Sequence, residues 1–246
     1  GQIVNGNGSF AIGDPNTVNG NNSFVLGDNN TINGGSQFGW GNFVQIMGNS
    51  NTVGATADSS GSTAIGTSNS VNATRAIAIG TSATVTGNSA AAIGDSTTAS
   101  GRISAAFGAF ANAGGAFGNE GTTAIGTGAL AGTTAAGQTY ATALGGNAQA
   151  QGANAIAIGG NAATGAGNAA FASASNAIAI GNGAQATAVN AVAQGNGAVA
   201  SGTSAVAVGQ NATAASAGSS AIGAGATVQA GATNSVAVGA GSVATS

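Results

Sequence analysis

The sequence predicts an all-β fold, a parallel β-solenoid or β-roll built from coils with a 14-residue repeat. Two observations predict it. Glycines close "AIG"-like stretches at a regular step of 14 in the numbering, and a second glycine often follows halfway to the next. Between these glycines, large apolar residues alternate with small ones, as side chains do on opposite faces of a strand. Each unit is therefore interpreted as strand, turn, strand, turn, with one coil stacked on the next.

The spacing of the marker glycines identifies the coils. A helix would need an apolar period near 3.6, and each glycine would weaken it by about 1 kcal/mol. Glycine instead suits tight turns because it adopts positive φ without a steric penalty. The series that keep the step of 14 are Gly13, Gly27 and Gly41; Gly66, Gly80, Gly94 and Gly108; Gly145 and Gly159; and Gly181, Gly195, Gly209 and Gly223.

The columns of the repeat predict which side chains face inward. Large apolar residues stand one and three positions before the marker, as Ile79 and Ile77 stand before Gly80. We expect these residues to fill the interior, together with a small apolar column five positions after the marker. The position four after the marker is mostly polar, as at Thr84, and is expected to face water.

Alanine dominates the column two positions before the marker, and we expect it to face away from the coil interior. A ladder of methyl groups suits close packing against another chain, which predicts a subunit interface. The alternative is a weak β-propensity in a low-complexity sequence. The alanines expected at the interface are Ala78, Ala92, Ala106, Ala157, Ala179, Ala193 and Ala207.

The composition argues against catalysis and against nucleic-acid binding. The 246 residues include only five acids and two arginines, and no His, Cys or Lys. The chain therefore lacks a histidine base, a thiolate and a basic surface, so we expect no enzyme, cofactor, metal site or nucleic-acid partner. Scattered acids also fail to supply the paired carboxylates of a solenoid glycosidase. No apolar run is long enough to span a membrane as a helix, so we expect no direct membrane insertion.

We expect a single β-roll domain over residues 1–246, with Asn- and Phe-rich coils at about 1–60 and regular coils at about 61–246. The 14-residue step breaks near 42–62, 109–124 and 127–143. Insertions in solenoids become loops that often bind partners, which makes Glu120 and Tyr140 the candidate ligand contacts. Phe43, Met47 and Phe110 are expected to fill the interior at the breaks.

Units such as "RAIAIG" (75–80), "NAIAIG" (154–159, 176–181) and "SAVAVG" (204–209) resemble the head repeats of the YadA-like trimeric autotransporter adhesins. The resemblance covers most of the chain. It implies a left-handed parallel β-roll, a parallel homotrimer and display on the outer membrane of a Gram-negative bacterium. It also implies a virulence-associated adhesin that binds host matrix proteins, cell-surface receptors or other surfaces and supports autoagglutination. The chain is then expected to be a head fragment without its stalk and anchor.

Two other functions remain open at this stage. Flat β-solenoids with threonine ladders can order water, and Thr17, Thr31, Thr84 and Thr98 share one column, so an ice-binding protein is the alternative. That ladder is interrupted further along the chain. A self-assembling filament protein is a further hypothesis for the same repeat.

Overall fold

A computed structural model describes residues 1–33, 41–161 and 169–246. The predicted all-β fold is confirmed: the chain is a parallel β-solenoid of about 16 coils, and most coils keep the 14-residue period. The described residues form short strands and one turn of 3-10 helix. The chain divides into two compact units, residues 1–121 and 122–246, and each is described by itself.

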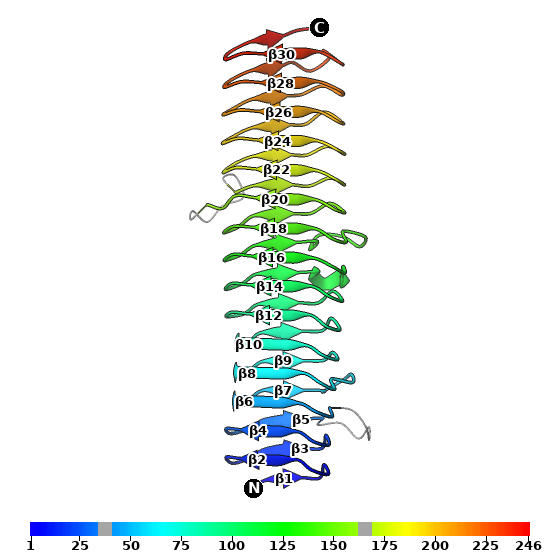
Figure 1. Ribbon diagram of the computed structural model, residues 1–246, viewed down its shortest axis with the longest axis vertical. Coiled ribbons are helices and arrows are strands. Elements are labelled where there is room, and N and C mark those ends of the chain that lie inside the picture. Colours follow the sequence, from blue (N-terminus) through cyan, green and yellow to red (C-terminus); the bar gives the residue numbers. More distant parts are fainter. Residues whose placement is uncertain (34–40, 162–168) are drawn as a thin grey trace. The chain divides into compact units, whose positions relative to one another are not determined.

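In the first unit, odd-numbered strands pair in one parallel sheet and even-numbered strands pair in a second, so every coil contributes one strand to each (Figure 1). We call these the odd sheet and the even sheet. The odd strands are β1 (Ile3–Val4), β3 (Asn16–Val18), β5 (Asn30–Ile32), β7 (Thr52–Val53), β9 (Ser70–Val71), β11 (Thr84–Val85), β13 (Thr98–Ala99) and β15 (Asn112–Ala113). The even strands are β2 (Phe10–Ile12), β4 (Phe24–Leu26), β6 (Gln45–Asn49), β8 (Thr63–Thr67), β10 (Ile77–Thr81), β12 (Ala91–Ile93) and β14 (Ala105–Phe107), and the 3-10 helix η1 spans Gly115–Phe117.

The second unit repeats this arrangement of an odd and an even sheet. Its odd strands are β17 (Leu130–Ala131), β19 (Gln149–Ala150), β21 (Phe171–Ala172), β23 (Gln185–Ala186), β25 (Val199–Ala200), β27 (Thr213–Ala214), β29 (Thr227–Val228) and β31 (Val243–Ala244). Its even strands are β16 (Thr123–Ile125), β18 (Thr142–Leu144), β20 (Ile156–Ile158), β22 (Ile178–Ile180), β24 (Val192–Gln194), β26 (Val206–Val208), β28 (Ser220–Ile222) and β30 (Val236–Val238).

Strand pairing stacks equivalent residues of successive coils. Ala78 of β10 lies opposite Ala64 on one side and Ala92 on the other, each one period away. One marker glycine was assigned wrongly, because Leu26 pairs with Met47 and the coil that follows Gly27 closes at Gly48 instead of Gly41. Phe38 and Trp40 stand three and one positions before Gly41, where inward-facing residues are expected, and they lie outside the described residues.

The alternation along the even strands has the opposite orientation to the one expected. The alanines predicted to form a subunit interface are fully buried inside their own coil, at 0% exposure: Ala78, Ala92, Ala106, Ala157, Ala179, Ala193 and Ala207. The large residues beside them face outward, and Ile77 is 41% exposed in the single chain. The prediction of an alanine interface is therefore wrong, since these methyl groups pack against the opposite sheet of the same chain.

The interior is filled mainly by alanine and valine because the two strands of a coil lie close together, and Ile32 and Ile46 are the largest aliphatic side chains buried there among the described residues. In most coils alanine from the even strand meets valine or alanine from the odd strand, such as Val85 and Ala99, which are both fully buried. The backbones of neighbouring coils also approach closely at the corners. A Cβ added to Gly80 would lie 2.1 Å from the carbonyl oxygen of Gly94, and Gly80 has φ 139°.

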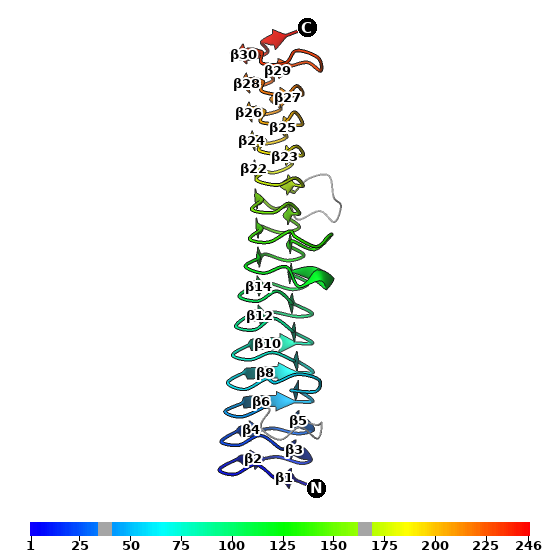
Figure 2. The ribbon, with the colours of Figure 1, turned by 90° about the vertical axis from the view of Figure 1, so that its right-hand side faces the viewer.

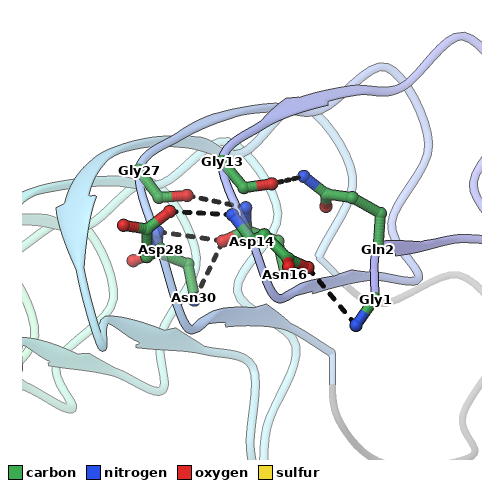
Figure 3. Close-up of polar contacts among 8 residues, drawn as sticks. All are labelled: Gly1, Gln2, Gly13, Asp14, Asn16, Gly27, Asp28 and Asn30. Atoms are coloured by element: carbon green, nitrogen blue, oxygen red, sulfur yellow. Dashed lines mark hydrogen bonds and ion pairs between the residues drawn. The ribbon is translucent and has the colours of Figure 1, made fainter.

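In the first coils, buried asparagines occupy an inner corner position at which later coils have alanine. We call these asparagines the buried amide ladder. Asn16, Asn30, Asn51 and Asn69 are each at most 2% exposed. The Asn30 amide donates to Asn16 Oδ1 at 3.1 Å (Figure 3). It also donates to the Gly48 carbonyl oxygen at 2.6 Å. In later coils the carbonyl oxygen of the marker glycine accepts a hydrogen bond from a backbone N–H instead, as Ala198 N–H donates to Gly195 O at 3.2 Å.

Candidate functional site

The outward side of the even sheet in the first unit is a largely apolar surface, interrupted by Gln45 and Thr63, which we call the outer apolar face. Phe10 and Phe24 stack on it with ring centroids 6.0 Å apart and planes 14° apart. Both rings remain exposed in the single chain, at 56% and 37%. The members of this face with large apolar side chains are Phe10, Ile12, Phe24, Leu26, Met47, Ile65, Ile77, Ile79, Ile93 and Phe107.

The second unit carries the same outer apolar face. It is uncharged, and its polar interruptions are Thr123, Thr142, Gln194 and Ser220, in β16, β18, β24 and β28. Its large apolar members are Ile125, Leu144, Ile156, Ile158, Ile178, Ile180, Val192, Val206, Val208, Ile222, Val236 and Val238. Exposed apolar patches of this length on soluble chains mark surfaces that another molecule covers.

The odd sheet presents a different surface to solvent. Its outward positions are half-buried and mostly polar in the first unit, as predicted: Thr17, Thr31, Thr52, Ser70, Thr84, Thr98 and Asn112. In the second unit the same column mixes Gln149, Gln185 and Thr213 with Leu130, Phe171 and Val199. The long hydroxyl ladder therefore belongs to the first unit, and among the described residues of the second unit Thr213 and Thr227 are its one stacked pair of hydroxyls.

A third surface follows the turn that leads from each odd strand into the next even strand, which we call the odd-to-even corner. One residue of each such turn has positive φ, and its backbone N–H donates to the preceding coil; Arg75 N–H, for example, donates to Ser60 O at 2.9 Å. Residues 54–58 and η1 are insertions into the 14-residue period of the first unit. Both precede this corner, and Figures 1 and 2 show them on one side of the coil. Residues 132–138 of the second unit occupy the equivalent connection, between β17 and β18.

Glu120, a predicted ligand contact, lies at this corner in the first unit. Its carboxylate forms an ion pair with Arg102, with Nη2 at 3.0 Å and Nε at 3.1 Å from Oε2. The Arg102 side chain stays 57% exposed and that of Glu120 35%. Because two guanidinium nitrogens of Arg102 contact the same Oε2 of Glu120, this corner presents an oriented guanidinium near the η1 insertion.

Tyr140, the other predicted ligand contact, lies at the odd-to-even corner of the second unit and is 50% exposed. It has φ 56°, a conformation that bulky residues seldom adopt. The residues expected to fill the interior are instead on the surface: Phe43 is 64%, Met47 46% and Phe110 61% exposed. The prediction that they plug the coil is wrong, because the interior has no room for them.

Asp28 serves as a backbone cap in the turn that follows a marker glycine. Asp28 Oδ1 accepts from Asp14 N–H at 2.7 Å (Figure 3). Asn49 Oδ1 caps Asp28 N–H in the same way at 2.9 Å. Asp58, in the 54–58 connection, accepts from Ser60. Burial raises the pKa of the Asp58 carboxyl, but hydrogen bonds from the Ser60 side chain and from backbone N–H groups outweigh it and lower that pKa below its ordinary value.

A family model described as the YadA head domain repeat matches residues 5–30, 57–83, 136–162, 163–184, 172–198, 186–212 and 200–226, which together make up more than half of the chain. The chain belongs to the YadA head family. It is thus the head domain of a YadA-like trimeric autotransporter adhesin, and the family supports an adhesin-type function for a surface-exposed passenger. A search of curated proteins finds no match.

Two further observations concern this YadA-like head. Among the described residues, no cluster of three or more potential metal ligands occurs, and no helix is long and apolar enough to cross a membrane. The sequence reasoning missed a row of exposed asparagines at the odd-to-even corner of the second unit. Their shared place before the strands of "NAIAIG" units was the signal that could have revealed it.

Proposed function

We propose that the chain is the non-catalytic head of a bacterial surface adhesin that assembles as a parallel homotrimer through the outer apolar face. The observation that carries this proposal is the apolar even sheet, whose large side chains remain half-exposed in a single chain. The expected homotrimer remains the proposal, but we now propose that the isoleucine and valine columns form its interface, not the alanine column beside them.

The energetics favour association through this face. Fully burying an Ile, Leu or Phe side chain contributes about 1.5–3 kcal/mol, so covering a half-exposed one contributes roughly 1 kcal/mol. Among the described residues the face has ten large apolar side chains in the first unit and twelve in the second, whereas association costs about 4–15 kcal/mol. The stacked coils also repeat the same surface, so one threefold contact would extend along many coils.

The mass of the native particle tests the trimer. We expect light scattering to give about three times the chain mass of 22.3 kDa at micromolar concentration. Ile158→Glu with Ile180→Glu places unpaired charge in the interface and should yield monomers. The matched control, Gln149→Glu with Gln185→Glu on the odd sheet, should leave the trimer intact. A wild-type mass of one chain would overturn the proposal.

We further propose that the trimer attaches to a host matrix protein or cell-surface receptor, or to other surfaces, and supports autoagglutination at the bacterial outer membrane. The exposed corner that carries Glu120, Arg102 and Phe117 supports a discrete contact there, since Phe117 is 52% exposed next to an oriented ion pair. Aromatic and arginine side chains together are typical of binding hot spots.

Binding of the folded trimer to immobilised matrix proteins tests this attachment. A charge exchange, Arg102→Glu with Glu120→Arg, keeps an ion pair but reverses its direction, so it should weaken binding while stability is unchanged. Exchange without any loss of binding, in a trimer that still binds matrix protein, would show that this corner is not the contact. A trimer that attaches to neither matrix proteins nor cells would contradict the adhesin proposal itself.

A further inference from the structure

The second unit has no charged side chain. All five acids and both arginines lie within residues 1–121, and residues 122–246 contain no Asp, Glu, Lys, Arg or His. A ligand of this unit must therefore be recognised through neutral hydrogen bonds and apolar contacts. An ionic ligand would lose hydration without gaining a partner charge, which is unfavourable.

A row of exposed asparagines follows the odd-to-even corner of this unit. Asn154, Asn176 and Asn190 precede β20, β22 and β24, which are neighbours in the even sheet (Figure 1). Asn154 Nδ2 donates to Asn176 Oδ1 at 3.2 Å, and Asn176 Nδ2 donates to Asn190 Oδ1 at 3.0 Å. We call these three residues the amide row. Neighbouring coils place its members about 4.8 Å apart.

The amide row is fixed in its conformation but retains free hydrogen-bonding capacity. A side-chain amide has two N–H donors and two acceptor lone pairs. The bonds within the row engage one donor and one acceptor of Asn176, so one of each is directed to solvent. Backbone bonds from Asn176 N–H to Ala153 O and from Asn190 N–H to Ser175 O hold the turns in place. A ligand would therefore meet groups that lose little freedom on binding.

An exposed aromatic ring stands at one end of the amide row. Tyr140 occupies the equivalent corner position of the preceding coil, because Asn154 N–H donates to Thr139 O at 2.9 Å. Its ring is half-exposed and combines an apolar face with a polar hydroxyl. The corner thus presents, in sequence, one aromatic ring and three amides, all without charge.

We propose that Tyr140 and the amide row bind a linear neutral glycan that runs along the coil stack. This inference rests on the adhesin function proposed above and names a ligand class for it. Sugar hydroxyls both donate and accept hydrogen bonds, which matches an amide that offers one N–H and one lone pair per coil. The C–H face of a sugar ring packs on an aromatic ring. Three copies in a trimer would raise the avidity for a polymer.

The test measures retention of the full 246-residue chain on immobilised neutral glycans, namely amylose, dextran, mannan and a β-1,4-glucan, with hyaluronan and heparin as acidic comparators. We expect retention on at least one neutral glycan and on neither acidic one. Raising NaCl from about 0.1 M to about 1 M should leave retention unchanged, because no charged group contributes. Retention on no neutral glycan, or retention abolished by salt, would overturn the inference.

The variants use glycine, which other coils already carry at this corner with positive φ, as at Gly218. Asn154→Gly with Asn176→Gly and Asn190→Gly should weaken glycan binding at least tenfold, and Tyr140→Asn should weaken it severalfold. The control, Asn182→Gly with Asn196→Gly, removes the amide pair at the opposite corner, where Asn196 Nδ2 donates to Asn182 Oδ1, and should retain wild-type binding. Equal loss in both sets would refute the assignment to the amide row.

Circular dichroism and the native mass separate loss of the site from loss of the fold. The amide-row variant should keep the β spectrum and the mass of the wild type. Binding to matrix proteins, measured on the same preparations, separates the two proposals. A trimer that binds matrix protein but no neutral glycan would remove the glycan inference and leave the adhesin function standing.

Discussion

Replacing Asn30 by alanine should destabilise the first coils far more than the size of the change suggests. Asn30 is 1% exposed and belongs to the buried amide ladder. Its amide nitrogen donates to Gly48 O and Asn16 Oδ1, and its Oδ1 accepts from the backbone N–H and the side-chain amide of Asn51, both at 3.0 Å. Alanine removes all four bonds at once.

The magnitude follows from the groups left behind. The Gly48 carbonyl and the Asn51 backbone N–H would remain buried without these partners, and each such group costs about 1–3 kcal/mol. Asn51 keeps its bond to Gly66 O at 2.8 Å, which limits the damage on that side. We therefore expect a loss of about 2–5 kcal/mol in the opening free energy of the coils on either side of Asn30.

Native-state hydrogen exchange followed by mass spectrometry is the appropriate assay, because a solenoid can open locally while distant coils stay folded. Exchange should accelerate in peptides that span residues 16–33 and 41–53 and stay unchanged beyond residue 122. The neighbouring Asn29 is the control: it is exposed at a corner where the next coils carry Ser50 and Ser68, so Asn29→Ser should change exchange little. Equal effects of the two substitutions would refute the structural role of the inner ladder.

Two further predictions concern a turn and a carboxylate. Gly80→Ala should lower the free energy of unfolding, measured in urea, by about 3 kcal/mol or more, because the new Cβ would collide with Gly94 O. Gly61→Ala is the control: its Cβ would meet only Arg75 Cγ at 3.5 Å, so it should lower that free energy by about 1–2 kcal/mol, for its positive φ. The lowered pKa of Asp58 means that its carboxylate stabilises the fold above the unfolded-state pKa, and that this contribution disappears as the pH falls through the folded-state pKa. Asp58→Asn should therefore reduce stability at pH 7 but not near pH 3, and equal differences at both pH values would contradict the assignment.

The 14-residue period of the fold could be predicted from the sequence because each coil has a position at which the backbone permits only glycine. Marker glycines such as Gly66, Gly80 and Gly94 stand where neighbouring coils approach too closely for a Cβ, so their spacing gives the coil length and the strand register. The same reasoning failed at Gly41, which keeps the step of 14 by coincidence. Strand pairing places Gly48 in its stead.

The orientation of the even strands could not be predicted from alternation alone. A period of two shows that Ile77 and Ala78 face opposite ways, but it does not say which one faces inward. Size suggested isoleucine, as in an ordinary core. The decisive quantity is the distance between the two strands of one coil, and that distance depends on the tight corners at both ends. Likewise, Glu120 and Tyr140 could be placed on the surface, but the partner of Glu120 depends on how η1 returns the chain beside Arg102.

The narrow interior explains why the large apolar side chains of this chain occupy its surface. A coil of such a short period encloses little more than two facing rows of small aliphatic side chains, and among the described residues only Ile32 and Ile46 bring an isoleucine inside. The apolar content that an ordinary domain would bury in its own core is therefore placed on one outer face, where only another molecule can cover it. Subunit association then supplies part of the hydrophobic stabilisation that the thin interior cannot. Two surfaces remain for ligands, the odd sheet and the corners, and it is at the corners that the sequence departs most from its own repeat.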